Sequence, residues 1–408
     1  MAGIRKKESK TGGKPTWQVY WRDPDGKQKA KNFPTQREAR AYASQVENDK
    51  NRGNYRDPNA GKVTFKAYAE EWLKVQTFNP STRETTTGRL NLHVYPHIGG
   101  VPLAALTPTK VQGMVKALQQ TSAVRKPKPG EKPQTLSAAY VGTILTDVKT
   151  ILNAAVADDK IAKNPAQASS VRPPKATRKK VVPFTHAQVA GIRDNLPEPY
   201  RIVATVAAGC GLRQGEVFGL SPDDIDHEAG VIHVRRQVKI LGSRLVFDLP
   251  KGGKERDVPL PKAVGLAIKK HTLKHRAHPV ALPWGDVDGP AVTVTLLVTS
   301  RERKAMNRNY FNPRILKPAL IAAKVEPVRE NMTHALRHWY ASVLLDAGES
   351  IVTVANNLGH ADPAFTLRTY THLMHDSNEK TREAVDNALA DVATASRDDS
   401  LLTPTAEG

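Results

Sequence analysis

Two stretches of the chain are too rich in glycine, proline and basic residues to belong to a packed core. The first, Gly53–Gly61, combines Gly, Asn and Pro, and the second, residues 171–182 (VRPPKATRKKVV), is basic and contains two prolines. Both compositions are typical of linkers between domains. They divide the 408 residues into three segments, so we expect a multidomain protein rather than a single large core.

Most of the net charge lies in the first two segments. Residues 1–60 contribute +7 and residues 61–180 contribute +12 to the total of +21, whereas residues 181–408 contribute only +2. Residues 375–408 carry 3 basic and 8 acidic side chains, so the chain ends in an acidic tail. A basic surplus of this size favours a polyanionic partner, either nucleic acid or an anionic membrane surface.

No feature of the sequence indicates membrane insertion or secretion. No apolar run approaches the ~20 residues needed to cross a bilayer, and the N-terminus MAGIRKKESK lacks the apolar stretch of a signal peptide. The lone Cys210 allows neither an intramolecular disulfide nor a thiolate metal cluster, which fits a reducing cytosol. We therefore expect a cytoplasmic protein with no membrane partner.

The first segment has the pattern of a small sheet with one helix. Trp17–Trp21 alternates, and after a turn Lys27–Phe33 reads as the returning strand. Thr35 is a suitable N-cap for a helix over 36–48. We expect a small three-stranded sheet packed on this helix within residues 1–55.

The second segment, residues 62–168, is expected to be a bundle of four helices. An apolar stripe at helical spacing begins at Phe65 and ends at Leu73. The Pro/Lys-rich stretch 124–133 predicts a loop. The other helices are expected near 82–94, 107–120 and 136–159.

The third segment, residues 183–385, mixes helical and strand patterns and precedes the acidic tail, residues 386–408. Strands are expected over 231–234, 244–249 and 256–260. Helices are expected over 186–195, 201–210, 262–274, 312–323, 333–347, 351–358 and 363–373. This pattern predicts an α+β domain.

Two basic residues of this segment lie beside glycines. Arg213, in AAGCGLRQGE, is either an exposed arginine at a helix end or an anion-binding arginine oriented by Glu216. Lys251 follows Pro250 at a turn between two predicted strands, in LPKGGKER. A lysine at such a turn is usually only solvated, but the two glycines would let it approach a ligand closely.

The motif HALRH places three basic side chains on one predicted helix. Residues three apart share a helix face, so His334 and Arg337 point the same way. His334 and His338, four apart, could instead bind a metal, as such pairs do in zinc helices. Residue 335 is Ala rather than the glutamate of that motif, and no third ligand is evident, so the sequence disfavours a metal site.

The last two candidates lie near the end of the segment. His360 follows Gly359, which we expect to be a left-handed helix cap, and Tyr370 comes ten residues later. A single tyrosine on an amphipathic helix usually packs in the core. With the other candidates, however, it completes a set of two arginines, a lysine, two histidines and a hydroxyl.

Phosphate chemistry requires this set of side chains. Guanidinium groups bind the phosphate oxygens and neutralise their charge. A tyrosine with an ordinary pKa of ~10 needs cationic neighbours to become a nucleophile, and a general acid must protonate the leaving alkoxide.

The chain resembles the tyrosine recombinase (phage integrase) family. GLRQGEVFGL is similar to the first arginine box of that family. HALRHWYASVLLDAG, followed by VANNLGHADPAFTLRTYTHL, is similar to the second box with its terminal tyrosine. Each residue alone is unspecific, but the order and spacing of all six positions are specific. The six are Arg213, Lys251, His334, Arg337, His360 and Tyr370.

The resemblance implies a catalytic role for each position. Tyr370 would be the nucleophile that forms a 3′-phosphotyrosine link to DNA, while Arg213 and Arg337 would clamp the scissile phosphate. Lys251 would be the general acid for the 5′-hydroxyl leaving group.

The remaining positions would act around that phosphate. His334 would assist proton handling, His360 would hydrogen-bond the phosphate, and Glu216 would support the arginines. His338 falls beside the motif, and the resemblance implies a structural role for it. Because the phosphotyrosine conserves bond energy for rejoining, the family uses neither a metal nor another cofactor.

The resemblance also assigns the domains. Residues 1–55 would bind arm-type DNA sites, and residues 62–168 would be the core-binding domain. Residues 169–182 would be a linker and residues 183–385 the catalytic domain. The expected fold is therefore multidomain, mainly α with small β-sheets, ending in the acidic tail 386–408.

The expected function is site-specific recombination by an integrase of a phage or mobile element. The enzyme would cleave, exchange and rejoin double-stranded DNA as a homo-tetramer, associated with the nucleoid of a bacterial host. DNA-bending and directionality factors are further partners that the family resemblance implies.

One spacing departs from the family. His360 and Tyr370 are one residue further apart than in many members, which would rotate the tyrosine by about 100° on a continuous helix. We expect a loop near Asp362-Pro363 to absorb this residue. Tyr340, the other tyrosine nearby, occupies a position that the family packs in its core.

Three alternatives stay open at this point. A type IB topoisomerase uses the same residue types, but relaxation needs no second DNA site, so an N-terminal DNA-binding sheet argues against it. A catalytically silent DNA-binding regulator of the same fold is disfavoured by the complete catalytic set. A metal-dependent nuclease would use His334 and His338, and insensitivity to chelators would exclude it.

Overall fold

The computed structural model describes most of the chain, which falls into two compact units, Met1–Arg178 and Lys179–Gly408. The boundary between the units lies inside the predicted linker 169–182. The predicted loop 124–133 and most of the predicted tail lie outside the described residues. No helix in the described part is long and apolar enough to cross a membrane. The described residues are 2–8, 14–23, 26–52, 55, 57, 59–123, 135–175, 181–371, 382 and 385–390.

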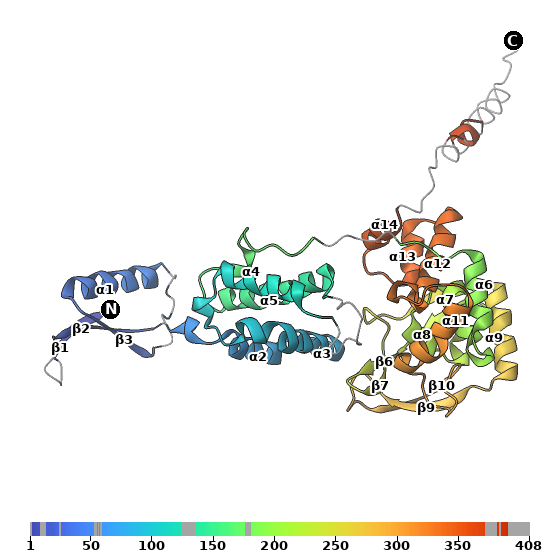
Figure 1. The fold of residues 1–408 in the computed structure, drawn as a ribbon, viewed down its shortest axis with the longest axis horizontal. Helices are drawn as coiled ribbons and strands as arrows, with labels where there is room; N and C mark the ends of the chain where they lie inside the picture. Colours follow the sequence, from blue (N-terminus) through green and yellow to red (C-terminus); the bar gives the residue numbers. More distant parts are fainter. Residues whose placement is uncertain are drawn as a thin grey trace, which may run out of the picture. The chain divides into compact units, whose positions relative to one another are not determined.

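The first unit begins with a three-stranded antiparallel sheet in the order β1-β2-β3, covered on one face by a helix (Figure 1). Its elements are β1 (Gly3–Lys7), β2 (Thr16–Arg22), β3 (Gln28–Phe33) and α1 (Gln36–Asn51). Val19 and Trp21 of β2 pack against residues of α1 at positions i, i+4 and i+7, which are Ala39, Ala43 and Val46. Thr35 caps α1 by accepting a hydrogen bond from the backbone N–H of Glu38. The predicted sheet and helix are therefore confirmed.

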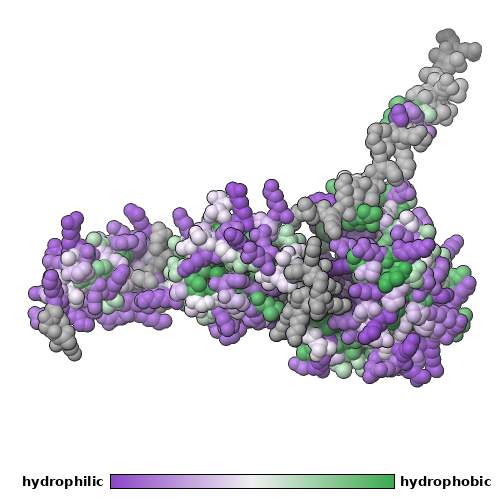
Figure 2. Space-filling view, viewed as in Figure 1, coloured by the Kyte–Doolittle hydropathy of each residue, from purple (hydrophilic) through white to green (hydrophobic). Residues whose placement is uncertain are grey.

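The outer surface of this sheet and helix is polar. On the face drawn in Figure 2, hydrophilic side chains cover most of the region formed by β1–β3 and α1. Strand β3 (QKAKNF) has no fully buried residue, and two of its six residues are lysines. The small core thus occupies one side of the sheet, and the charged side chains remain available to solvent.

The rest of the first unit is helical, as predicted. Its helices are α2 (Phe65–Val75), α3 (Pro80–Arg89), α4 (Pro108–Gln120) and α5 (Ala138–Ala157), with the 3-10 turns Ala60–Lys62, Leu103–Ala105 and Pro165–Gln167. The expected helix near 82–94 extends further, because a π-helical stretch, Leu90–Gly99, continues α3. This stretch contains Pro96, which has no N–H for the usual helical hydrogen bond. Val171 is buried in the same core, so packed structure reaches past residue 168.

The second unit contains helices around three small antiparallel sheets, with strand orders β4-β5-β8, β6-β7 and β9-β10. Its strands are β4 (Ile225–Asp226), β5 (Val231–Val234), β6 (Gln237–Leu241), β7 (Arg244–Asp248), β8 (Arg256–Pro259), β9 (His278–Pro283) and β10 (Ala291–Leu296). Its α-helices are α6 (His186–Asn195), α7 (Arg201–Cys210), α8 (Gln214–Phe218), α9 (Lys262–Lys274), α10 (Arg308–Phe311), α11 (Lys317–Ala322), α12 (Thr333–Asp346), α13 (Ile351–Leu358) and α14 (Pro363–Tyr370). Short 3-10 turns cover Glu198–Tyr200, Pro222–Asp224 and Arg329–Asn331, and Asn312–Leu316 is π-helical. The predicted α+β fold is confirmed.

Helix α7 runs through the core of this unit and carries small and branched apolar residues on nearly every position. It packs against α12, the helix that contains the HALRH motif. A separate apolar cluster joins α12, α13 and α14 and consists of Tyr340, Ala341, Leu345, Val354, Leu358 and Tyr370. These contacts bring the ends of α7, α13 and α14 toward one face of α12.

Candidate active site

The site is organised around a buried carboxylate at the start of α8. Glu216 accepts a hydrogen bond from the backbone N–H of Arg213 at 2.8 Å and another from its Nη1 at 2.9 Å. Arg256, at the start of β8, binds the same carboxylate through two nitrogens at 3.0 and 2.8 Å. Burial alone would raise the pKa of Glu216, but the hydrogen bonds and positive charge of Arg256 and Arg213 outweigh it and hold the pKa at about 2. Glu216 is therefore a permanent anion that fixes both arginines.

The C-terminal end of α13 fixes the same arginines and a third one. The last carbonyls of a helix have no partner within the helix and carry its negative dipole end. Here three consecutive carbonyls receive guanidinium groups, with Arg256 bonded to Asn357, Arg337 to Leu358 and Arg213 to Gly359. The two preceding carbonyls, of Ala355 and Asn356, accept from the backbone N–H groups of His360 and Gly359. The helix end thus acts as a template that gathers three cations.

Arg337 lies deepest of the three, with 1% of its surface exposed. Its Nη1 donates to the carbonyl of Gly211 at 2.7 Å, and its Nη2 also contacts Nε2 of His360 at 3.0 Å. In the described part of the chain it has no carboxylate partner. Burial, followed by repulsion from Arg213, lowers the pKa of Arg337 to about 9. Arg213 and Arg256 share the carboxylate of Glu216 and Arg337 binds none, so the cluster keeps a surplus of positive charge that an anion would relieve.

His360 is held from both sides. Nε2 accepts from Arg337, and Nδ1 lies 2.7 Å from the hydroxyl of Thr366, a fully buried residue of α14. Burial and the neighbouring Arg337 lower the pKa of His360 to about 4, so the ring is neutral at physiological pH. Since its Nε2 is already occupied by Arg337, an entering phosphate would have to replace that contact to reach it.

Tyr370 is buried at the end of α14, with 1% of its surface exposed. Its hydroxyl lies 2.6 Å from Nδ1 of His338, and burial raises the pKa of Tyr370 to about 12. His338 is in turn packed edge-on against His334, with ring centroids 4.7 Å apart. The predicted nucleophile is thus in contact with the histidine for which the resemblance implied only a structural role.

His334 lies at the exposed edge of the site. Together with Arg213 it lines a cavity of about 220 Å³ that also contains Arg308. Protein atoms crowd its buried side, and this, followed by the nearby His338 and Arg337, lowers its pKa. Among the described residues, no group of three or more His, Cys, Asp or Glu side chains could hold a metal ion, so His334 and His338 have no third ligand there.

The predicted lysine is not drawn into this cluster. Lys251 lies exposed in the turn between β7 and β8, where Gly252 and Gly253 both have positive φ angles. Among the described residues it makes no hydrogen bond or ion pair with the other five candidates. Its turn is nevertheless followed directly by β8, whose first residue, Arg256, is part of the cluster.

The spacing between His360 and Tyr370 is resolved as predicted. Gly359 caps α13 in the left-handed conformation, with φ of 61°. Residues 359–362 are not helical, and α14 begins at Pro363 after the N-cap Asp362, whose side chain accepts from the backbone N–H of Ala364 at 2.9 Å. This short loop absorbs the additional residue.

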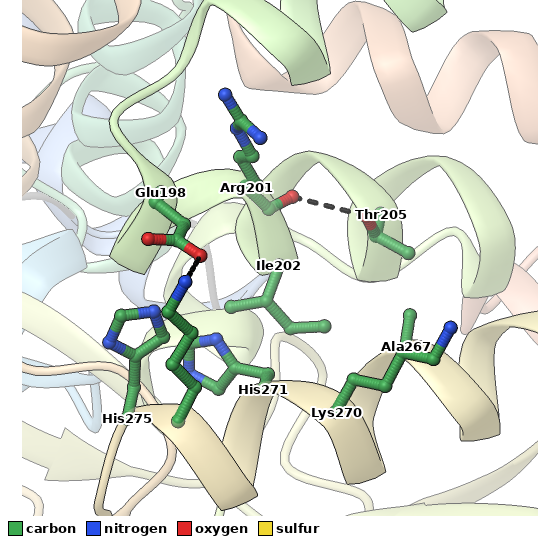
Figure 3. A pocket seen from close by; sticks show the side chains of 9 residues that line it. Glu198, Arg201, Ile202, Thr205, Ala267, Lys270, His271 and His275 are labelled. Carbon is green, nitrogen blue, oxygen red and sulfur yellow. Dashed lines mark hydrogen bonds and ion pairs between the residues drawn. The ribbon is translucent and has the colours of Figure 1, made fainter.

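A second cavity, of about 330 Å³, lies between α7 and α9 and contains none of the candidate residues. Figure 3 shows its wall, where Thr205 bonds the carbonyl of Arg201 and the carboxylate of Glu198 is paired with a lysine. His271 on the same wall contacts the carbonyl of Leu297. Part of its polar lining is thus paired, although Nε2 of His275 on this wall is buried without a hydrogen-bond partner among the described residues. None of the three clustered arginines of the candidate site lines this cavity.

Two members of the site were missed by sequence reasoning. Arg256 reads locally as an ordinary charged residue at the start of a strand, and Thr366 as a polar residue on an amphipathic helix. Their partners, Glu216 and His360, are distant or on a different element, so no local pattern identifies them. The three carbonyls that bind the arginines are backbone groups, so the side chains of those residues do not reveal them.

Two family models match the chain, one in the third segment of the sequence and one in the second. The phage integrase family model matches residues 182–376, a range that contains all six candidate positions. The N-terminal SAM-like domain of phage integrases matches residues 64–119, within the predicted core-binding domain. The chain belongs to the phage integrase family of tyrosine recombinases. The predicted family is therefore confirmed.

Relatives of this integrase-family chain include phage and prophage proteins. It is 26% identical over 366 residues to the putative prophage phiRv2 integrase of Mycobacterium tuberculosis, covering 87% of this chain and 88% of that protein. It is 25% identical over 340 residues to the integrase of Mycobacterium phage L5, covering 83% and 81%. These matches extend well beyond the catalytic motifs.

Solved integrase structures share the fold. The Tn1549 transposon integrase in complex with a circular intermediate DNA superimposes with a TM-score of 0.62 at 20% identity, covering 80% of this chain and 99% of that one. A lambda integrase dimer bound to a core site gives a TM-score of 0.55 at 16% identity, covering 91% and 95%. The recombinase architecture predicted from the motifs is thus found in the structure.

Proposed function

We propose that this tyrosine recombinase is the integrase of a phage or mobile element, and that it acts on double-stranded DNA through a 3′-phosphotyrosine intermediate. Its membership of the phage integrase family makes site-specific recombination its function and does not favour the topoisomerase or silent-regulator alternatives. The observation that carries the mechanism is the arginine cluster, in which three guanidinium groups lie together with one carboxylate, which binds two of them, beside a buried tyrosine.

The cluster is suited to a phosphodiester. Arg337 is a desolvated cation without a carboxylate partner in the described part of the chain, so a phosphate oxygen would supply the missing countercharge. Arg213 is partly exposed on the side of the 220 Å³ cavity and would bind a second oxygen. Because Glu216 and the α13 carbonyls hold these guanidinium groups in advance, little reorganisation is needed as charge develops on the phosphate.

The chemical steps follow from these positions. Tyr370 Oη would attack the phosphorus, forming the phosphotyrosine bond as the bond to the 5′ oxygen breaks. Lys251, on its glycine-rich turn, would move toward the DNA and protonate the 5′ oxygen, while His334 at the exposed edge would contact the phosphate region. Attack by a 5′-hydroxyl of the partner strand would then reverse these steps and release the tyrosine.

The other parts of the chain would deliver the DNA. We assign arm-type sites to residues 1–55 and the core site to residues 62–168, with residues 183–385 as the catalytic domain. One lambda integrase structure is a tetramer bound to a Holliday junction, which supports a homo-tetramer as the active assembly here. DNA-bending and directionality factors would act with this assembly at the bacterial nucleoid.

The test is covalent capture of DNA by the full-length protein. The substrates are nicked duplexes that together cover the DNA on either side of the gene for this protein. After cleavage, the short 5′-hydroxyl fragment diffuses away and cannot rejoin, so the adduct accumulates. We expect a protein–DNA adduct on one sequence, no adduct with Tyr370→Phe, and an unchanged yield with Tyr340→Phe, since Tyr340 is buried in the same apolar cluster. Specific binding without any adduct would indicate a regulator, and an adduct that persists in Tyr370→Phe would mean a different nucleophile.

A further inference from the structure

The hydroxyl of Tyr370 has one hydrogen-bond partner in the described part of the chain, and that partner is a histidine outside the six-residue motif. Nδ1 of His338 lies 2.6 Å from Tyr370 Oη, and the two rings meet edge-on with centroids 5.6 Å apart. Both side chains are held by packing, His338 on α12 and Tyr370 in the apolar cluster of α12, α13 and α14. The contact is thus a fixed feature of the folded catalytic unit.

The surroundings set the charge states of the two groups. Burial and the adjacent Arg337 lower the pKa of His338 to about 4, so the ring is neutral at physiological pH and can accept a proton. Tyr370 is protonated under the same conditions because burial raises its pKa. In the neutral tautomer that carries its proton on Nε2, Nδ1 accepts from the phenol, which is the arrangement of a nucleophile and its general base.

His334, to which the motif assigned proton handling, is placed differently. It shares the cavity with Arg213 and has no hydrogen bond to Tyr370 among the described contacts. It reaches the nucleophile only through the ring of His338, which stands between them in an edge-on stack. The geometry therefore separates a histidine at the tyrosine from a histidine at the phosphate-binding cavity.

Resting on the proposed recombinase chemistry, we propose that His338 is a catalytic residue, the general base that takes the phenolic proton of Tyr370. As Oη bonds to phosphorus, the phenolic proton moves to Nδ1 of His338 and the bond from phosphorus to the 5′ oxygen breaks. The 5′ oxygen takes its proton from the ammonium of Lys251. On rejoining, the attacking 5′-hydroxyl gives its proton to the neutral amine of Lys251, and the imidazolium returns its proton to the departing tyrosine. Protons and electron pairs therefore balance over the cycle.

The test separates the base from the acid by changing the leaving group. A duplex with sulfur in place of the bridging 5′ oxygen has a leaving thiolate that needs no proton. We expect Lys251→Ala to cleave the ordinary duplex slowly and the sulfur duplex at the wild-type rate. His338→Ala should be slower than wild type by ~100-fold or more on both duplexes, the range expected for a lost general base.

A second variant separates proton transfer from positioning. His338→Asn can place an acceptor oxygen near the position of Nδ1 but cannot hold the proton, so it should stay as slow as His338→Ala. A circular dichroism spectrum and a urea-unfolding curve equal to those of the wild type show that each variant is folded. The proposal is overturned if His338→Asn cleaves at the wild-type rate, or if the sulfur duplex restores the rate of His338→Ala. It is also overturned if His338→Ala cleaves less than ~100-fold more slowly than the wild type. Failure of the wild-type protein to form any adduct would instead reject the proposed function.

Discussion

Glu216 is the residue that holds two of the three clustered arginines in place. Its carboxylate binds two arginines through four hydrogen bonds and is itself fully buried. A buried charge is tolerated only where partners replace its lost hydration. The carboxylate and its arginines therefore stabilise one another, and the surplus positive charge is left facing the place where a phosphate would bind.

The first prediction concerns Arg256, the partner that binds Glu216 through two nitrogens. Arg256→Ala removes one of the two arginines that bind the buried carboxylate of Glu216, which should lower the free energy of unfolding by about 3 kcal/mol. It should also slow cleavage, because Arg213 would lose its fixed position. Urea unfolding and the suicide-substrate assay measure the two effects.

Arg235→Ala is the matched control for this variant. Arg235 also binds a buried carboxylate, that of Asp224, but it is partly exposed, and Arg236 holds the same group through two further hydrogen bonds. We expect a loss below about 1 kcal/mol and normal cleavage. Equal stability of the Arg256 and Arg235 variants would contradict the role given to Arg256.

For single residues, the sequence identified most members of the site but not which of them form ion pairs with one another. Arg213, Arg337, His360 and Glu216 were recognised because their motifs are local, and the structure brings these four together. Their catalytic roles stay predictions, as does that of Lys251. The Arg256–Glu216 pair joins residues 40 positions apart, and such a distance in the chain cannot be read from spacing.

Among the elements, the short helix α13 has the largest effect on the site. Its apolar residues Val354, Ala355 and Leu358 are buried, while its C-terminal carbonyls accept hydrogen bonds from three arginines. The left-handed Gly359 ends the helix at the point where these carbonyls can face the cluster. Termination of α13 is therefore as important to the site as the side chains that it gathers.

The second prediction tests this helix end with Gly359→Ala. A Cβ at this position would lie 3.0 Å from Cδ and Nε of Arg256, in addition to the strain of an alanine at φ of 61°. Gly348→Ala, just after α12, is the control, since Gly348 has φ of 90° but no atom near an added Cβ. Both variants should lose about 1 kcal/mol from the left-handed backbone.

Only Gly359→Ala should then displace Arg256. We expect it to lose further stability and to cleave the suicide substrate at least about tenfold more slowly, which corresponds to ~1.4 kcal/mol of barrier. Gly348→Ala should cleave at the wild-type rate. If both variants cleave equally fast, the fit between Gly359 and Arg256 has no part in catalysis.

Elements with strong local signals were predicted with nearly correct bounds. The periodic apolar positions gave α6, α7, α9 and α13, with Thr185 as the cap of α6, and the alternating residues gave β5. In the second unit, strands β4, β6, β9 and β10 were missed. Strand β9 contains Pro279 and Pro283, which argue against a strand locally, and its partner β10 is separated from it by a turn-rich stretch. Pairing between strands is a tertiary interaction that propensity does not encode.

Across the whole molecule, the net charge is unevenly divided. Residues 181–408 carry only +2, because their acidic side chains nearly match the basic ones in number, whereas residues 1–180 carry +19 of the net +21. Affinity for DNA that comes from phosphate neutralisation falls steeply with salt, roughly in proportion to the number of phosphates contacted. Salt dependence should therefore reside mainly in the N-terminal part of the chain.

The third prediction is that deleting residues 1–60 removes arm-type binding and spares catalysis. The deleted part contains 14 basic side chains and its own small core, Val19 and Trp21 packed on α1, which is distinct from the core of α2–α5. The truncated protein should bind arm-type DNA far more weakly and show a shallower salt dependence in filter or anisotropy titrations. It should still form the Tyr370 adduct on a core-site suicide substrate, because the arginine cluster, His338 and Tyr370 all lie in the second unit. If the truncated protein lost adduct formation together with arm binding, then the first sixty residues would support the catalytic step itself.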